Sequence, residues 1–146
     1  MRRKQRDMEE GEKCERRIES LLKERGIGTF KRSVDTIYDL MNDEGSVFIE
    51  IKCRYNYRKD TLQNYIIGKN KMDRMKKYPS STEFYFICCF KDGDLICKLN
   101  DLVKDKHYKE GTFQRKDRGL LEQHKVCFIG QEIFKNVDDI KSLNEV

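Results

Sequence analysis

The sequence predicts a mixed α/β fold in which a mixed β-sheet is flanked by helices. Three stretches lead to this prediction. Apolar residues recur at helical spacing within residues 9–24, apolar and charged residues alternate through residues 46–54, and residues 84–90, "FYFICCF", form a nearly continuous apolar run. They predict an amphipathic helix, a strand with two unlike faces and a strand covered on both faces.

The first predicted element is the helix over residues 9–24. Its narrow apolar stripe consists of Cys14, Ile18, Leu21 and Leu22. Gly26 and Gly28 follow and are expected to end the helix. Glu15 borders the apolar stripe, so its side chain can reach toward a sheet. Glu10 borders the other side and Glu19 lies further out, and either could take the same role.

Three strands are predicted next. Residues 29–41 alternate loosely, as one or two strands, and residues 46–54 form the clearest strand of the chain. Between them, Glu44 and Gly45 fit a two-residue hairpin loop that would pair Asp43 with Ser46. Continued along the strands, this register places Asp39 directly opposite Glu50.

The strand over residues 46–54 carries an unexpected charge pair. Strand side chains alternate, so Glu50 and Lys52 share one face, and Ile49 and Ile51 share the other. Carboxylates directly opposed on a sheet, as Asp39 and Glu50 would be, repel each other and favour a bound cation. Oxygen ligands favour magnesium or manganese. The alternative is a surface strand whose charged side chains are simply solvated.

The second half of the chain is also predicted to contain both helices and strands. A polar loop is expected over residues 55–64, a helix over residues 69–77 with Met72 and Met75 facing inward, and strands over residues 84–90 and 95–99. The element order is therefore αβββαββ. Beyond it we expect a polar loop over residues 104–124, a short strand over residues 125–129 and a terminal helix over residues 131–143.

Composition limits the possible partners. The 146 residues fit one domain, 39% of them are charged, and the formal net charge is +5. Clusters of basic residues suit polyanions, although a solvated lysine-rich surface would look the same. No apolar run is long enough to span a membrane and no signal peptide is recognisable, so we expect an intracellular protein, cytoplasmic or nuclear, that is not secreted. The spacing of the six cysteines indicates neither a zinc site nor a disulfide framework.

These residues resemble the PD-(D/E)XK nuclease superfamily, whose restriction-endonuclease-like core is a helix, a three-stranded meander, a helix and a further strand. Asp39 followed by Glu50, Ile51 and Lys52 matches the family's motif, and "GEKCERRIESLLKERGI" is similar to the opening helix of archaeal Holliday junction resolvases. The resemblance spans roughly residues 10–100 and weakens in the extension over residues 101–146. Tyr38 stands where the family often has proline, which leaves Asp35 as a rival for Asp39.

The resemblance implies a set of site residues. Carboxylates of Asp39, Glu50 and Glu15, with the Ile51 carbonyl, would hold Mg²⁺ or Mn²⁺, and Lys52 would act on the attacking water or the phosphate. The family often has a lysine or glutamine on its second helix, for which Lys71 is the first candidate, followed by Lys69 and Gln63. Residues expected to contact nucleic acid are Arg54, Tyr55, Tyr57, Arg58 and Lys69.

The sequence therefore predicts a single-domain, metal-dependent endonuclease with DNA as the favoured substrate. The alternatives are an RNA endonuclease of the same fold, a nuclease-like protein that binds nucleic acid without cutting it, and a charged α/β interaction protein. A homodimer is expected because enzymes of this size often dimerise to cut both strands.

Overall fold

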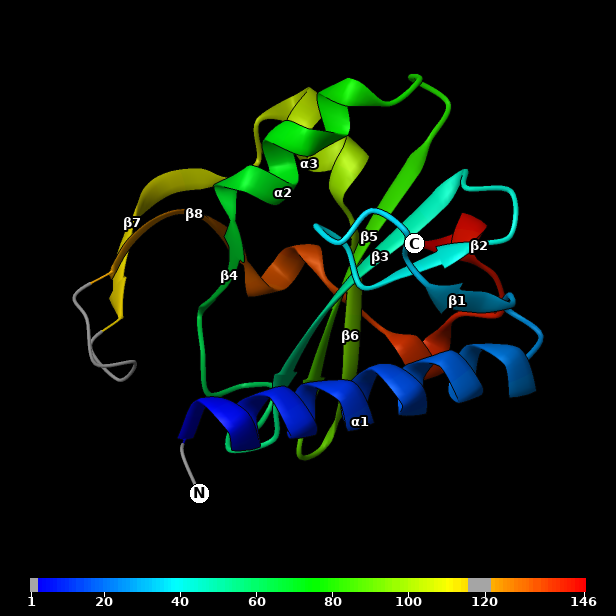
Figure 1. Cartoon of the computed structure of the whole chain (residues 1–146), viewed down its shortest axis with the longest axis horizontal. Coiled ribbons are helices and arrows are strands. Elements are labelled where there is room, and N and C mark those ends of the chain that lie inside the picture. The colour runs from blue at the N-terminus through cyan, green and yellow to red at the C-terminus, as the bar shows by residue number, and fades with distance from the viewer. Residues whose placement is uncertain (1–2, 116–121) are drawn as a thin grey trace.

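The computed structural model describes residues 3–115 and 122–146 and has the predicted mixed α/β architecture, with a central sheet flanked by helices (Figure 1). The sheet consists, in spatial order, of β1 (Phe30–Arg32), β2 (Leu40–Asn42), β3 (Val47–Arg54), β5 (Glu83–Phe90), β6 (Gly93–Lys98) and β9 (Lys135–Asn136). Only β3 and β5 pair in parallel, and every other pair of neighbours in this sheet is antiparallel. The sheet is therefore mixed.

Different elements cover the two faces of the sheet. The helix α1 (Arg3–Glu24) packs on one face, where Ile18 and Leu22 are fully buried in a core that they share with Ile49 and Ile51. The other face is covered by α2 (Lys69–Arg74), α3 (Leu99–Asp105) and a second sheet of β4 (Asn64–Gly68), β8 (Glu122–Gly130) and β7 (Lys109–Arg115). Figure 1 shows α1 below the sheet, with α2 and α3 above it.

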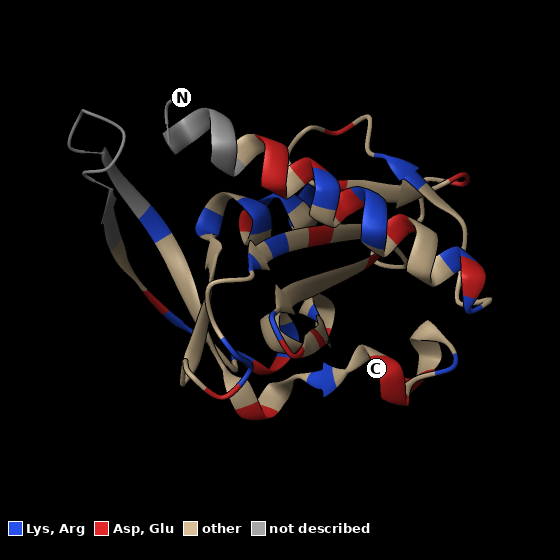
Figure 2. Cartoon of the chain, turned by 90° about the horizontal axis from the view of Figure 1, so that it is seen from below, with Lys and Arg blue, Asp and Glu red and all other residues tan. Residues whose placement is uncertain are grey.

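The helix α1 ends where the sequence predicts. Gly26 has a φ of +70°, its N–H donates to the Lys23 carbonyl, and the N–H of Ile27 donates to the Leu22 carbonyl. These two bonds are the Schellman arrangement, which needs a left-handed residue and so favours glycine. Figure 2 shows acidic and basic residues interspersed along the helix rather than gathered by sign.

The predicted register between β2 and β3 is confirmed. Leu40 pairs with Ile49 and Met41 pairs with Phe48, so Asp39, directly before β2, lies beside Glu50. The predicted two-residue loop is wrong, because residues 43–46 all lie outside the two strands.

The connection between β2 and β3 is instead built on Asn42. Its Oδ1 accepts hydrogen bonds from the backbone N–H groups of Ser46, at 2.9 Å, and Val47, at 3.1 Å. Among the described residues of this turn only Gly45 has a positive φ, +67°, whereas a type I′ loop would need two such residues. The side chain of Asn42 thus replaces backbone pairing at the end of the hairpin.

Several predicted elements agree with the structure. The helix expected over residues 69–77 is α2 followed by a 3-10 turn at Met75–Lys77, and Met72 and Met75 are buried as predicted. All residues of β5 from Phe84 onward are buried, as expected for a strand covered on both faces. The strand β6 covers residues 95–98 of the run predicted at 95–99, Leu99 being the first residue of α3, and β8 covers the run predicted at 125–129 and is longer than predicted.

The loop expected over residues 104–124 is wrong for the described part of that range. The helix α3 extends to Asp105 and β7 follows from Lys109, whereas residues 116–121 lie outside the described residues. The strand β4 was also not predicted. The residues of β7 are mostly polar, whereas β4 has an apolar run of only three residues, Tyr65, Ile66 and Ile67, and each strand pairs antiparallel with β8.

The terminal helix predicted over residues 131–143 is absent from the described chain. Short 3-10 turns and β9 take its place. Three carbonyls of this segment, those of Val137, Asp138 and Ile140, accept hydrogen bonds from the Arg25 guanidinium, and β9 pairs with β6. These tertiary bonds use backbone groups that a helix would need for itself.

None of the helices in residues 3–115 and 122–146 is long and apolar enough to cross a membrane.

Candidate active site

The carboxylate of Glu50 is the most unusual group in the core. It lies on the face of β3 that also carries Phe48, and its exposed fraction is 0%. Its Oε1 is buried and has no hydrogen-bond partner among the described residues, although buried carboxylate oxygens normally have one. Burial, and then the nearby charge of Asp39, raises the pKa of Glu50 to about 7. The fold therefore holds a carboxylate at a free-energy cost.

Two lysines partly offset that cost. The Lys71 ammonium, from α2, contacts Glu50 Oε2, and the Lys52 ammonium lies 3.4 Å from the same oxygen. The Lys71 and Lys52 side chains are 19% and 30% exposed, so the pair opens toward solvent on the lysine side. Burial lowers the pKa of Lys52, and the charge of Glu50 opposes that effect.

Asp39 completes the carboxylate pair. Its Oδ2 accepts a hydrogen bond from the Ile51 backbone N–H at 2.7 Å, which fixes the carboxyl group beside β3. Burial raises the pKa of Asp39; the side-chain contact with Glu50 opposes this rise, and the contact with Glu15 adds to it. The Asp39 carboxyl, directly before β2, thus contacts two other predicted carboxylates, Glu50 from β3 and Glu15 from α1.

The rival acidic residues are engaged elsewhere. Asp35 Oδ2 accepts hydrogen bonds from Arg74 Nε, at 2.9 Å, and from the Tyr78 hydroxyl. Glu10 is exposed on α1, and Glu19 lies 4.0 Å from Arg16 on the same helix. Asp35 therefore anchors the end of the α2 region, while Asp39 is the aspartate beside Glu50.

Contacts also distinguish the three candidates for the second-helix residue, Lys71, Lys69 and Gln63. Lys69 pairs with Asp73 at 2.8 Å and lies 3.9 Å from Glu110. Gln63 precedes β4, where its carbonyl accepts the N–H of Gln131. Of the three candidates, Lys71 is the residue that reaches Glu50.

Of the residues predicted to contact nucleic acid, Lys69 is on α2 and the other four lie at or directly after the carboxyl end of β3. Arg54 is half-buried and lines a cavity of about 100 Å³ together with Lys52. Tyr55 is tied to α1, because Arg17 Nε donates to its hydroxyl at 2.6 Å. Tyr57 is 43% exposed, and the Arg58 guanidinium lies 3.6 Å from Asp92. Arg54 is therefore the member of this set that adjoins Lys52.

Tyr38 has a positioning role that the sequence reasoning missed. Its ring is buried between Phe48 and Phe84, and its hydroxyl donates to the Lys71 carbonyl at 2.6 Å. This bond ties α2 to the start of β2 and thereby sets where Lys71 lies. The signal in the sequence was Tyr38 itself, an aromatic residue next to Asp39 at a position where the resembled family often has proline.

The donor atoms suit a hard divalent cation. Asp39, Glu50, Glu15 and the Ile51 carbonyl offer oxygen ligands, and the unpartnered Oε1 of Glu50 is a buried acceptor that a cation would satisfy. Within residues 3–115 and 122–146, however, no three His, Cys, Asp or Glu side chains already surround a common point. The Lys71 ammonium lies against Glu50 instead, so an ion and Lys71 would compete for this carboxylate.

Comparison with known proteins gives one structural match. No family model and no curated protein matches the chain. A solved structure, D212, a nuclease from a fusselovirus, is similar to it with a TM-score of 0.48 and 16% sequence identity, over 84% of this chain and 80% of that chain. Because this similarity is low, the function of the chain is inferred from the geometry of its own site.

Proposed function

We propose that this chain is a metal-dependent endonuclease of the PD-(D/E)XK type that hydrolyses phosphodiester bonds, with DNA as its substrate. The observation that carries the proposal is the fully buried Glu50, which has one unpartnered oxygen, a neighbouring aspartate and two lysines at its other oxygen. A core that served stability alone would gain by replacing such a group with an apolar one. A reaction that needs oxygen ligands and cations at one point explains why it is retained.

The residues of the site divide the chemistry among them. Asp39 and Glu50, with Glu15 and the Ile51 carbonyl, would hold Mg²⁺ or Mn²⁺. The bound ion would supply positive charge against the scissile phosphate and acidify water. The lowered pKa of Lys52 suits an amine that exchanges a proton with the attacking water or stabilises the charge of the pentavalent phosphate.

Lys71 would have a role both without and with a bound metal ion. Without an ion its ammonium offsets the charge of Glu50, and with one it would be free to contact a phosphate oxygen. The bond from Tyr38 to the Lys71 backbone keeps the ammonium at the site in either case. The Ile51 N–H holds the Asp39 carboxyl in one orientation, which reduces the ordering needed when an ion binds.

Nicking of supercoiled plasmid tests the proposal. Wild-type protein should nick DNA in Mg²⁺ or Mn²⁺ and not in EDTA, and Glu50→Gln and Lys52→Met should abolish nicking with native circular-dichroism spectra. Glu44→Gln, in the exposed turn before β3, and Lys31→Met, on the edge strand β1, are matched controls that should cut normally. Wild-type rates in the Glu50 or Lys52 variants would exclude this site.

Parallel reactions separate the alternatives. Faster cleavage of single-stranded RNA than of any DNA would make the protein an RNA endonuclease. Tight, salt-sensitive binding of nucleic acid without cleavage in any divalent metal would make it a binding protein, and salt-independent or absent binding would favour a protein interaction role.

A further inference from the structure

Three cavities of the described chain share a lining residue, Asn64, and they lie between the proposed active site and the second sheet. The cavity of about 100 Å³ lined by Lys52 and Arg54 includes Asn64, the first residue of β4. A second cavity, of about 450 Å³, adjoins Asn64 and Glu132, and a third, of about 510 Å³, adjoins both residues again. Asn64 therefore lines all three.

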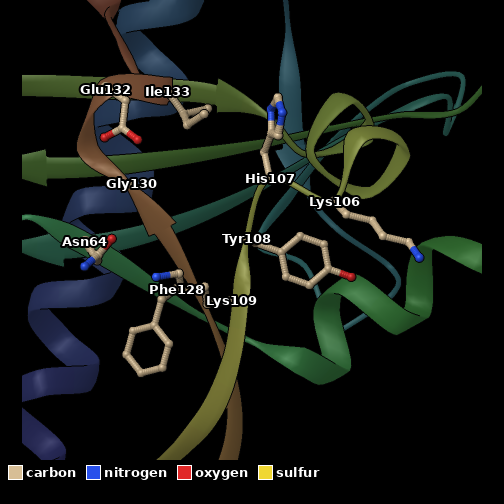
Figure 3. Close-up of a pocket in the computed structure, with 9 residues that line it drawn as sticks. All are labelled: Asn64, Lys106, His107, Tyr108, Lys109, Phe128, Gly130, Glu132 and Ile133. Atoms are coloured by element: carbon tan, nitrogen blue, oxygen red, sulfur yellow. The ribbon is translucent and has the colours of Figure 1, made fainter.

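The third cavity combines cationic and aromatic side chains (Figure 3). Lys106, His107, Tyr108 and Lys109 come from the α3–β7 connection and the start of β7, Phe128 comes from β8, and Glu132 comes from the following 3-10 turn. Tyr108 and Phe128 are half-buried, whereas the two lysines are exposed. Among the described residues, neither lysine has an ion-pair partner.

The backbone at Lys106 is also unusual. It follows the last turn of α3 with a φ of +54°, a left-handed conformation that favours glycine, and it is the one described non-glycine residue with a positive φ. A lysine at such a position costs stability that glycine would restore. Lys106 is one of the residues that line the third cavity, as are Tyr108 and Lys109.

We propose that this pocket, together with the two cavities that share Asn64 with it, one of them lined by Lys52, is a binding track for an unpaired DNA strand, and that one nucleotide of that strand lodges in the pocket. This inference rests on the proposed function and names its substrate class. The volume of about 510 Å³ falls in the range of pockets that hold small ligands of nucleotide size.

The chemistry of the track fits a single strand rather than a duplex. Aromatic rings beside lysines bind single strands because any base can stack while cations hold the backbone. Tyr108 and Phe128 offer faces for a base, and Lys106 and Lys109 offer charge for phosphates. Glu132 and Asn64 can accept hydrogen bonds from the amino groups of a base. In a duplex, base pairing occupies these edges and stacking covers the faces.

Binding in EDTA tests the track without cleavage. Wild-type protein should bind fluorescein-labelled single-stranded DNA at least tenfold more tightly than a blunt duplex of the same sequence. Lys106→Gly should leave the melting temperature unchanged or raised, and should lower the magnitude of the slope of log K against log salt concentration by about 0.7 for single strands. Lys104→Ala, at an exposed lysine of α3 that does not line the pocket, is the matched control and should bind as wild type.

Stacking of a base in the pocket can be measured separately, by fluorescence. A 2-aminopurine base placed at successive positions of the strand should lose fluorescence at the position that lodges in the pocket. Tyr108→Ala should abolish this quenching and weaken binding at least about fivefold, whereas Tyr108→Phe should retain both. Because Tyr108 packs against the core, Lys106→Gly decides the matter if Tyr108→Ala does not fold.

The outcomes separate this inference from the proposed function. If the wild type nicks plasmid but prefers duplex, or if Lys106→Gly binds single strands with the wild-type slope, the track is wrong and the endonuclease stands. If the wild type neither binds nor cuts any nucleic acid, the proposed function itself fails.

Discussion

Neutralising Glu50 should make the metal-free protein more stable at alkaline pH. The pKa of Glu50 is raised to about 7 in the folded protein, from an ordinary value of 4.5. Each pKa unit corresponds to 1.36 kcal/mol, so keeping Glu50 ionised in the folded state costs about 3 kcal/mol. Glu50→Gln resembles the protonated form and avoids this cost.

The difference in stability between the wild type and Glu50→Gln should depend on pH. Below pH 4.5 Glu50 is protonated in both the folded and the unfolded states, so the wild type and Glu50→Gln should differ little. Between pH 4.5 and about 7 the unfolded chain releases this proton while the folded protein retains it, so wild-type stability falls relative to the variant as pH rises. Above about pH 7 the difference should stay near 3 kcal/mol.

Urea unfolding in EDTA at several pH values measures this difference. A difference of about 3 kcal/mol corresponds to a melting temperature higher by roughly 6–12 °C in a domain of this size. Glu44→Gln, exposed in the turn before β3, should stay within about 0.5 kcal/mol of wild type. Free Mn²⁺ at 100 times its Kd should stabilise only the wild type, by about 2.7 kcal/mol, and so remove most of the variant's advantage.

A less stable Glu50→Gln at pH 8 in EDTA would refute this reasoning. It would mean that the contacts of Glu50 with Lys71 and Lys52 stabilise the fold on balance, and that the buried carboxylate needs no functional explanation.

Three further predictions concern neighbouring groups. Asp39→Asn removes a like charge beside Glu50, so in EDTA the variant should melt at or above the wild-type temperature. Mn²⁺ should raise the melting temperature of the variant much less than that of the wild type, and equal shifts would show that Asp39 is no ligand. Tyr38→Phe loses the bond to the Lys71 carbonyl and should cost about 1 kcal/mol in urea unfolding and slow plasmid nicking, and an unchanged rate would show that this bond does not position Lys71. Arg25→Met removes the donors to the carbonyls of residues 137, 138 and 140 and should lower the free energy of unfolding by about 2 kcal/mol. Hydrogen exchange over residues 135–140 should become faster, and unaltered exchange there would mean that β9 alone holds this segment.

The central strands could be predicted because their signals are local. The alternation in β3 and the apolar run of β5 each determine which faces are buried. Gly26 supplies the left-handed residue that ends α1. The register between β2 and β3 followed from a short connection, even though Asn42 makes that connection in a way that was not expected.

The second sheet and the C-terminal segment could not be predicted in the same way. The strands β4 and β7 are held by β8, which is distant from β4 in the sequence; β7 is largely polar, and the apolar run of β4 is only three residues long. The segment after Gly130 contains apolar residues at spacings that suit a helix. Arg25, more than a hundred residues earlier, binds its carbonyls instead.

The sequence by itself determined which residues are candidates for the site, because Asp39, Glu50 and Lys52 are placed by one hairpin and one strand. Only the tertiary structure decided their electrostatics. Glu50 is buried because α2 and the second sheet cover the face of β3 on which it lies, and Lys71 reaches it because Tyr38 holds α2 there. Burial and the approach of charges from other elements depend on the packing of distant segments, which no local pattern records.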